Sequence, residues 1–320
     1  MKKWEQRKKE RQKGETEMSD SKKKIGFIGL GIMGKPMCRN VKKAGYEVVL
    51  FNRSKESVRE LAAEGAIAAA SVAEVASQCE VIITMLPNSP EVREVCLENG
   101  IADHAKAGTM VIDMSSIDPV QTKEIGAELA KYGIEMMDAP VSGGEPGAIA
   151  GTLSVMVGGT KENFDRYYDL LMTMASSVVY VGELGSGNVA KLANQVIVAI
   201  NIAAVSEAMT LAVKNGADPK LVYEAIRGGL AGSNVLDAKI KKMLEHEFQP
   251  GFRTELHIKD LTNALNAAHV TSTALPLTSQ VMEIMQSLKA EGKEKEDHSA
   301  ILRYYEKISN TSLKNETSES

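Results

Sequence analysis

The stretch Gly185-Ser-Gly-Asn-Val-Ala-Lys-Leu-Ala-Asn-Gln195 begins the segment around which the whole chain is organised. Two glycines mark a turn, Asn188 is a candidate helix cap, and a helical pattern continues until Asn215-Gly216. At about 1.5 Å per residue this helix measures roughly 40 Å, enough to cross a domain. Ala, Val, Ile and Leu occupy nearly all of its faces, so we expect most of the helix to be buried.

Lys191 lies one turn inside this helix, with Asn194 and Gln195 at i+3 and i+4 on the same face. A lysine near a helix N-terminus opposes the helix macrodipole, which indicates an anionic partner at the same place. The alternative is a lysine whose ammonium group reaches water from the first turn. The sequence before the helix bears on this choice.

A second motif follows a short apolar strand predicted at residues 24–29. Gly29-Leu-Gly31-Ile32-Met33-Gly34 is the Gly-x-Gly-x-x-Gly fingerprint of dinucleotide-binding domains, here in its required place between a strand and a helix. The first glycine permits a tight turn, the second lets the backbone approach a pyrophosphate, and the third lets the helix pack against the strand. We therefore expect this loop to bind the cofactor.

The residues after the second predicted strand, 46–51, bear on the choice of cofactor. An NAD site usually has an acidic residue here, which binds the ribose 2′-hydroxyl. This chain has Asn52-Arg53-Ser54, and Arg53 can pair with a 2′-phosphate. We expect these three residues in the cofactor site, with NADP(H) favoured over NAD(H). The alternative is that Arg53 stacks on adenine without selecting a cofactor.

Strands and helices continue to alternate, which predicts a parallel, doubly wound sheet. The further strands are expected near 66–68, 80–86, 109–113, 134–137, 151–158 and 177–181. Ligands of such sheets bind at the C-terminal ends of the strands, so Leu86, Pro87 and Ser116 are candidate cofactor contacts. The alternative is that they are ordinary turn residues.

The segment Asp138-Ala-Pro-Val-Ser-Gly-Gly-Glu-Pro-Gly147 contains too much glycine for a core element and predicts a loop. Its backbone N–H groups and the Ser142 hydroxyl could hold a carboxylate. Beyond the long helix only helices are predicted, which indicates a separate helical domain. Lys259 is one of many charged residues in this part, and its local sequence alone indicates a solvent-exposed side chain. The five histidines lack metal-ligand spacing, so no metal site is expected.

Composition limits the classes of partner. Residues 1–24 carry a balance of +5 and the whole chain −4, so residues 25–320 carry −9, which argues against nucleic acid. The basic tail 1–24 is expected to be disordered, with Met18 as the suspected true start, and 309–320 is expected to be a second disordered tail. Three cysteines without metal-ligand spacing fit a reducing cytoplasm. Polar residues inside the long helix argue against a membrane span.

Four blocks resemble the β-hydroxyacid dehydrogenase family. They are Gly26-Phe-Ile-Gly-Leu-Gly-Ile-Met-Gly34, Asp138-Ala-Pro-Val-Ser-Gly-Gly144, Gly185-Ser-Gly-Asn-Val-Ala-Lys191 and Lys259-Asp-Leu261. They follow the family's order between residue 25 and about 307. The finer stretches 82–90, 192–199, 225–233 and 297–300 look like its tartronate semialdehyde reductase (2-hydroxy-3-oxopropionate reductase) subgroup.

The resemblance implies a Rossmann domain at 25–184 and an all-helical domain at 185–308 that includes the long helix as connector. It implies Lys191 as the catalytic residue and Lys259 as a contact near the nicotinamide. It implies that Ser142, Gly143 and Gly144 bind the substrate carboxylate, and that the protein is a homo-oligomer, a dimer or tetramer, with the long helices packed between subunits.

Two positions depart from the common pattern of the family. Many members have Asn four residues after the catalytic lysine, where this chain has Gln195 beside Asn194, so either amide could orient the substrate. Related enzymes with an acidic residue at position 52 tend to use NAD, so the subgroup resemblance leaves the cofactor open.

These observations predict hydride transfer from NADPH to the aldehyde carbon of a small 3-oxo acid, with Lys191 as general acid. The subgroup resemblance points to tartronate semialdehyde as the substrate, and 3-hydroxyisobutyrate and succinic semialdehyde are the alternatives within this reaction class. A related imine-reducing branch typically lacks lysine at the 191 position. The alternative from another class is a non-catalytic module that binds NADP(H) or assembles partners.

Overall fold

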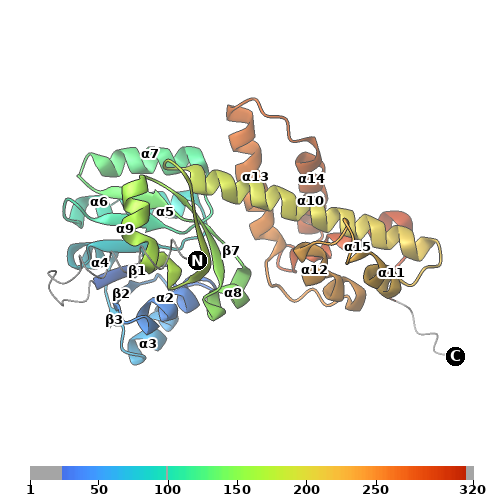
Figure 1. Cartoon of the computed structure of the whole chain (residues 1–320), viewed down its shortest axis with the longest axis horizontal. Helices are drawn as coiled ribbons and strands as arrows, with labels where there is room; N and C mark the ends of the chain where they lie inside the picture. Colours follow the sequence, from blue (N-terminus) through green and yellow to red (C-terminus); the bar gives the residue numbers. More distant parts are fainter. Residues whose placement is uncertain (1–23, 99, 315–320) are drawn as a thin grey trace, which may run out of the picture.

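The computed structural model describes residues 24–98 and 100–314, so residues 1–23 of the expected tail at 1–24, with Met18, lie outside the described residues, and Lys24 is the first residue of a strand. Two lobes lie side by side and are joined by one long helix, α10 (Ser186–Lys214), which runs from the sheet lobe across the helical lobe (Figure 1). The expected two-domain organisation, a Rossmann-type sheet and an all-helical part, is thereby confirmed.

The first lobe is built on a sheet whose described strands run in the order β3-β2-β1-β4-β5-β6-β8-β7, with β9 paired to β8. The strands are β1 (Lys24–Ile28), β2 (Glu47–Phe51), β3 (Ile67–Ala68), β4 (Val81–Thr84), β5 (Met110–Asp113), β6 (Glu135–Asp138), β7 (Val141–Ser142), β8 (Leu153–Gly158) and β9 (Ala175–Gly182). The helices around it are α2 (Gly34–Lys43), α3 (Lys55–Ala63), α4 (Val72–Gln78), α5 (Ser89–Leu97), α6 (Ile101–His104), α7 (Pro119–Ala130), α8 (Gly144–Ala150) and α9 (Lys161–Met172).

The strand order reverses between β1 and β4, which is the switch point where doubly wound sheets bind ligands. Both neighbours of β1 are parallel to it, with Gly26 opposite Val49 on one side and Ile82 on the other. The central strands are mostly apolar because helices cover both of their faces, and two buried clusters fill the spaces between sheet and helices.

The expectation of a parallel sheet is wrong at one edge. Strand β8 runs antiparallel to β6, where Asp138 is opposite Gly158, and antiparallel to β7, where Ser142 is opposite Ser154. Between Asp138 and Leu153 the chain forms no long crossover helix, and such a crossover is what two parallel strands require. Sequence periodicity gave no sign of this change in direction.

The predicted loop at 138–147 is also only partly a loop, because β7 and the first residues of α8 lie within it. Gly143 and Gly144 have φ values of +136° and +62°, which residues with a side chain rarely adopt. The glycines therefore permit a sharp turn between two short regular elements.

The second lobe contains only helices in its described part. They are α11 (Pro219–Ile226), α12 (Asn234–Glu245), α13 (Thr254–Val270), α14 (Pro276–Ala290), the 3₁₀ helix η2 (His298–Ile301) and α15 (Leu302–Ser309). They pack around the second half of α10 over one apolar core. The core includes Leu313, which is only 3% exposed, so the expectation of a disordered tail from 309 is wrong up to this residue; 315–320 lie outside the described residues.

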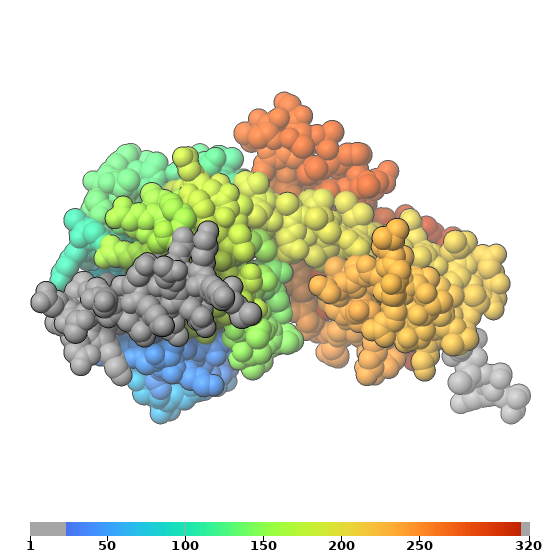
Figure 2. All heavy atoms as spheres, viewed as in Figure 1, coloured from blue at the N-terminus to red at the C-terminus, as the bar shows by residue number. Residues whose placement is uncertain are grey.

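Helix α10 is less buried than the sequence suggested. Val189, Ile197 and Leu211 are 53%, 60% and 66% exposed, respectively. Figure 2 shows the helix at the surface between the two lobes. By length and hydropathy alone α10 could cross a membrane, but core helices of soluble proteins pass the same test. Its buried polar side chains, described below, form hydrogen bonds within the protein.

Candidate active site

The N-terminus of α10 is held by a buried carboxylate from the sheet. Asp138, at the end of β6, accepts the backbone N–H of Gly185 (2.7 Å) and of Asn188 (2.6 Å). Burial raises the pKa of this carboxyl to about 6, although the two N–H donors oppose the shift. An added Cβ at Gly187 would lie 2.4 Å from the Met156 carbonyl oxygen, so only glycine permits this close packing. Asp138 thus fixes where α10 begins.

Asn188 does not cap the helix, contrary to our expectation. Its side-chain oxygen accepts the Ile117 N–H (3.1 Å), and its amide group donates to the Thr122 hydroxyl (3.2 Å). It therefore connects α10 to the segment after β5. The capping role belongs to Asp138, which is distant in sequence.

Lys191 is buried, with 8% of its surface exposed. Its ammonium group donates a hydrogen bond of 3.2 Å to Gln195 Oε1, one helical turn further on. Burial lowers the pKa of Lys191 below its ordinary value, Lys259 acts in the same direction, and Asp260 opposes both. The side chain therefore does not reach water freely, which contradicts the solvated alternative.

Gln195 connects Lys191 to a second buried group. Its Nε2 donates to Asp260 Oδ2 at 2.6 Å. The other carboxylate oxygen of Asp260 accepts the Ser116 hydroxyl at 3.0 Å and lies 2.9 Å from Lys259 Nζ. Lys259 also donates to the Ser116 carbonyl oxygen at 2.6 Å. Residues from α10, α13 and the loop after β5 thus form one polar cluster.

Asn194 has a different environment from Gln195. Its Oδ1 is buried and has no hydrogen-bond partner among the described residues. Gln195 is therefore the amide that contacts Lys191, whereas the Asn194 oxygen is free to accept a hydrogen bond. The sequence left open which of the two amides is near Lys191, and the structure gives that contact to Gln195.

The Ser142-Gly143-Gly144 segment lies at the same edge of the sheet as the start of α10. The Pro140 carbonyl oxygen accepts the Met156 N–H at 3.1 Å, and the carbonyl of Met156 packs against the first turn of α10. Ser142 of β7 is paired with Ser154 of β8, which lies two residues before Met156 on the same strand. Strand β8 thus links the glycine segment to the helix that carries Lys191.

The glycine-rich loop has the geometry that a dinucleotide requires. Gly29 has φ +97°, and a Cβ there would lie 2.2 Å from the Met85 carbonyl oxygen. A Cβ added at Gly34 would lie 2.0 Å from the Gly29 carbonyl oxygen. An added Cβ at Gly31 meets nothing within 4 Å, which leaves room for a pyrophosphate against the backbone. The residues present therefore fit a dinucleotide cofactor.

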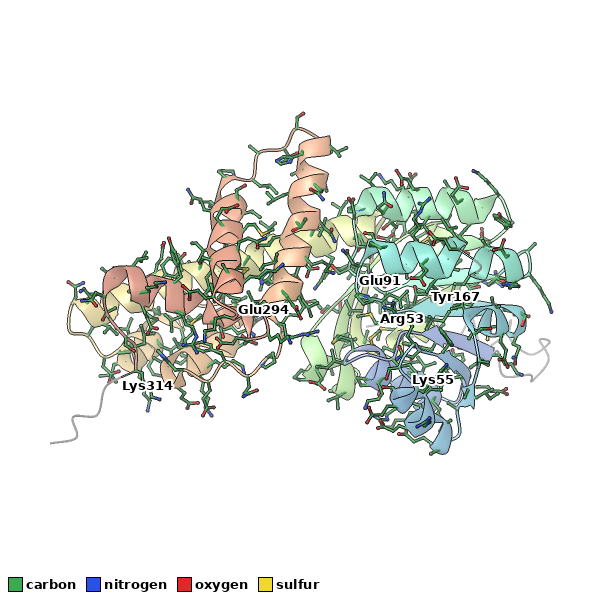
Figure 3. All side chains as sticks on the ribbon, turned by 180° about the vertical axis from the view of Figure 1, so that it is seen from behind. Arg53, Lys55, Glu91, Tyr167, Glu294 and Lys314 are labelled. Carbon is green, nitrogen blue, oxygen red and sulfur yellow. The ribbon has the colours of Figure 1, made fainter. Side chains whose placement is uncertain are left out.

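The other predicted cofactor contacts lie at the C-terminal ends of neighbouring strands. After β2, Asn52 accepts the Leu30 N–H at 3.0 Å and so orders the glycine-rich loop. Arg53 (Figure 3) and Ser54 are exposed before α3. Ile32 and Pro87 are also exposed, whereas Met33, Leu86 and Ser116 are partly buried. The Leu86 N–H donates to Ser115 Oγ at 2.9 Å.

A buried histidine pair was missed by sequence analysis, which found the histidines scattered. His257 and His298 meet with their Nδ1 atoms 2.8 Å apart, and His257 Nε2 is 3.2 Å from the Gln195 carbonyl oxygen. That carbonyl can only accept, so His257 Nε2 carries the proton and His298 Nδ1 donates to His257. Burial lowers the pKa of His257 to about 4. No group of three or more metal-ligating residues occurs in 24–98 and 100–314.

Asp260 and Asp138 stand in the quoted motifs, but no role was predicted for either. Asp260 was visible only as the neighbour of Lys259, and its position three residues after His257 on one helix face was the available signal. For Asp138 no local signal existed, because its partners lie 47 and 50 residues away.

The fold and this cluster define a class, namely a nicotinamide-dependent oxidoreductase with a Rossmann domain and a helical domain. Residues 24–182 match the family model described as the NAD binding domain of 6-phosphogluconate dehydrogenase. Residues 185–305 match the model described as NAD-binding of NADP-dependent 3-hydroxyisobutyrate dehydrogenase.

Individual relatives agree with these matches. The chain is 40% identical to 2-hydroxy-3-oxopropionate reductase of Escherichia coli K12, over 91% of this chain and 99% of that protein. Among solved structures, Mycobacterium tuberculosis 3-hydroxyisobutyrate dehydrogenase with L-serine has 32% identity and a TM-score of 0.83, covering 89% of this chain and 99% of that one. Psf3 in complex with NADP⁺ and 2-OPP has 26% identity and a TM-score of 0.79, covering 88% and 99%.

The chain therefore belongs to the β-hydroxyacid dehydrogenase family, also called 3-hydroxyisobutyrate dehydrogenase-like. It is an NAD(P)-dependent oxidoreductase that acts on the hydroxyl group of hydroxy acids.

Proposed function

We propose that the protein reduces tartronate semialdehyde (2-hydroxy-3-oxopropionate) to glycerate with NADPH as the hydride donor. The observation that carries the proposal is the buried Lys191, which lies within hydrogen-bond distance of Gln195 in the polar cluster between the two lobes. The 40% identity to the Escherichia coli 2-hydroxy-3-oxopropionate reductase supports this choice of substrate.

In this proposal the nicotinamide cofactor supplies the hydride and the residues of the chain supply position and charge. The charged Lys191 ammonium stabilises the oxygen that becomes an alkoxide and then donates a proton to it. Burial lowers the pKa of Lys191, which eases loss of the proton, and the negative charge of Asp260 opposes this shift. In the oxidative direction neutral Lys191 accepts the proton.

The substrate carboxylate is held by the Ser142 hydroxyl and the backbone N–H groups of Gly143 and Gly144. The positive φ angles of both glycines turn the backbone sharply at this point, which favours convergent N–H donors. The free Oδ1 of Asn194 accepts a hydrogen bond from the substrate hydroxyl. Gln195 instead orients Lys191.

The cofactor site consists of the glycine-rich loop and the strand ends beside it. It contains Gly29, Gly31, Ile32, Met33, Gly34, Asn52, Arg53, Ser54, Leu86, Pro87, Ser116 and Lys259. The exposed Arg53 pairs with the 2′-phosphate, which favours NADP(H) over NAD(H). Psf3, which has the same fold, was solved with NADP⁺, and this supports the choice.

A second candidate substrate is 3-hydroxyisobutyrate. The C-terminal family model and the Mycobacterium tuberculosis structure favour it. Succinic semialdehyde belongs to the same reaction class. An imine reductase or a non-catalytic NADP(H)-binding module is disfavoured by the buried Lys191 and its hydrogen-bonded partner.

The test is steady-state oxidation of NADPH and, in parallel, of NADH, with tartronate semialdehyde and with a panel of other aldehyde acids. We expect fast turnover of tartronate semialdehyde with NADPH and slow turnover with NADH. Fast turnover with NADH alone would retain the reductase and reject the role of Arg53. Turnover restricted to 3-hydroxyisobutyrate, measured in the oxidative direction, would replace the substrate. Cofactor binding without turnover on any compound would favour the binding module.

The proposal includes a homo-oligomer, dimer or tetramer, with exposed apolar residues of α10 between subunits. It also places the protein in the cytoplasm. The three cysteines support this location because all are buried and free of disulfide bonds.

A further inference from the structure

We propose that Asp260 is a positioning residue, which acts through Gln195 to orient the Lys191 ammonium group and to hold it in its charged form. The inference deepens the proposed function and rests on Lys191 being the proton donor. Asp260 does not contact Lys191 in the way a catalytic partner would, since Gln195 stands between them.

The relay is continuous and buried. Lys191 Nζ donates to Gln195 Oε1 at 3.2 Å, and Gln195 Nε2 donates to Asp260 Oδ2 at 2.6 Å. The three residues are 8%, 5% and 1% exposed. Because a carboxylate bound to the amide N–H₂ polarises the amide, its oxygen becomes a better acceptor for an ammonium group. Gln195 thus transmits the charge of Asp260 to Lys191 and fixes the direction of the Lys191 side chain.

The two oxygens of Asp260 have different partners, which fixes the plane of the carboxylate. Oδ2 accepts from Gln195, while Oδ1 accepts the Ser116 hydroxyl and faces Lys259. Ser116 belongs to the sheet lobe, so the geometry of Lys191 depends on the contact between the lobes. A second contact, from Asn263 Nδ2 to Asn88 Oδ1 at 3.3 Å, holds α13 to the sheet lobe nearby.

The groups that face Lys191 carry opposing charges. From α13 these are Asp260, Lys259 and His257, and from η2 it is His298; Lys239 of α12 acts on the two histidines. Burial, His257 and Lys239 lower the pKa of His298 well below its usual value, although Asp297 opposes the shift, so both histidines are neutral near pH 7. Asp260 is therefore the acid that favours the charged form of Lys191, against Lys259 and against burial.

Burial alone would raise the pKa of Asp260, but Lys259 and Lys191 hold it below its ordinary value. Asp260 consequently stays ionised at every pH at which Lys191 would have to act. Its charge is present throughout the working range, as the relay requires.

The test is the titration of Lys191 in the full-length protein, followed by NMR on protein with ¹³C-labelled lysine Cε. The Lys191 signal is identified by its absence in Lys191→Met. Asp260→Asn keeps the shape of the side chain and an acceptor oxygen but removes the charge. We expect it to lower the Lys191 pKa by about one unit or more. An unchanged Lys191 pKa would overturn the proposal.

Gln195→Met tests the same relay with Asp260 left intact, which matters if Asp260→Asn fails to fold. It should lower the Lys191 pKa in the same direction, and in its background Asp260→Asn should have a clearly smaller effect. If the two substitutions lowered the Lys191 pKa by fully additive amounts in the double variant, the role of Gln195 as the intermediary would be overturned. Glu306→Gln, which removes another buried carboxylate of the helical lobe, should leave the Lys191 pKa unchanged.

The kinetic counterpart is the pH profile of aldehyde reduction. Reduction requires charged Lys191, so activity falls as the pH rises through its pKa, and Asp260→Asn should move this fall to lower pH. If no aldehyde acid is turned over by the unmodified protein, the proposed function fails, but the NMR titration still decides the role of Asp260.

Discussion

Lys191 illustrates how burial sets the chemistry of a single residue. Replacing it with Met fills similar space but removes the proposed proton donor. We expect turnover to fall ~10²–10⁴-fold, the contribution typical of a positioned general acid. NADPH affinity, measured by fluorescence titration, should stay unchanged because Lys191 is not among the proposed cofactor contacts and the glycine-rich loop is left intact. Lys214→Met, at the exposed end of the same helix, is the control and should retain full activity. Substantial activity in Lys191→Met would reject its role.

Arg53 is the residue whose replacement tests cofactor choice. Removing one charge-assisted hydrogen bond costs ~1.5–3 kcal/mol, so Arg53→Ala should raise KM for NADPH roughly tenfold or more. KM for NADH should hardly change, because NADH lacks the 2′-phosphate. Lys55→Ala is the matched control, because it removes a nearby positive charge whose contact is within the protein: the Lys55 ammonium lies 4.9 Å from the centre of the Phe51 ring. Equal losses for both cofactors in Arg53→Ala would indicate adenine stacking instead.

Residue types that work through a local motif were predictable, and residues that work through tertiary contacts were not. Lys191 and the three loop glycines stand in fixed sequence patterns, so the sequence located them. Asp260 lies 65 residues from its partner Gln195, and His298 lies 41 residues from His257. The neighbouring residues of each helix do not identify Gln195 or His298 as partners, and only packing brings these pairs together.

At the scale of elements, the start of α10 depends on one glycine. A Cβ at position 187 would lie 2.4 Å from the Met156 carbonyl oxygen and 2.8 Å from that of Asp138, and neither backbone atom can move easily. Gly187→Ala should therefore lower the free energy of unfolding by ~1–3 kcal/mol or more, measured by urea denaturation. At Gly228 an added Cβ meets nothing within 4 Å, so Gly228→Ala should leave stability nearly unchanged. A stable Gly187→Ala would show that α10 can shift.

The Asp138 cap makes this helix entry dependent on pH. Its pKa is raised to about 6 in the folded protein, from an ordinary value of 3.8, mainly because it is buried. Between these pH values the folded state binds more protons than the unfolded state, so this group's contribution to stability decreases as pH rises. Asp138→Asn should abolish this contribution. Its stability deficit relative to wild type should thus be larger near pH 4 than near pH 7, and the reverse order would contradict the prediction.

Most elements followed the sequence pattern because each carries its own apolar period and boundary signals. The edge formed by β7 and β8 did not, since strand direction depends on the connection between strands. Two-residue strands and the four-residue α6 are too short to show a period. The exposed side of α10 could not be read from periodicity, because an apolar helix sequence does not show which of its faces packs in the core; only the family resemblance pointed to a free face.

At the scale of the whole molecule, the two lobes are connected by α10 and by the contacts of α13 with the sheet lobe. Lys259 and Asp260 bind Ser116 across this junction. The proposed catalytic lysine, two of the proposed cofactor contacts and the proposed positioning carboxylate are therefore joined where the lobes meet. A change in the relative position of the lobes would alter all three together.

The exposed apolar face of α10 leads to the last prediction, on assembly. Val189, Ile197 and Leu211 expose 53%, 60% and 66% of their surfaces along one long helix, a cost that a second subunit would remove. We expect light scattering after size-exclusion chromatography to give a dimer or tetramer, and Ile197→Asp to shift it toward the monomer. Tyr132→Asp, a change at a 50% exposed site on the sheet lobe, is the control. A monomeric wild type, or an Ile197→Asp variant that assembles like wild type, would reject α10 as the subunit contact.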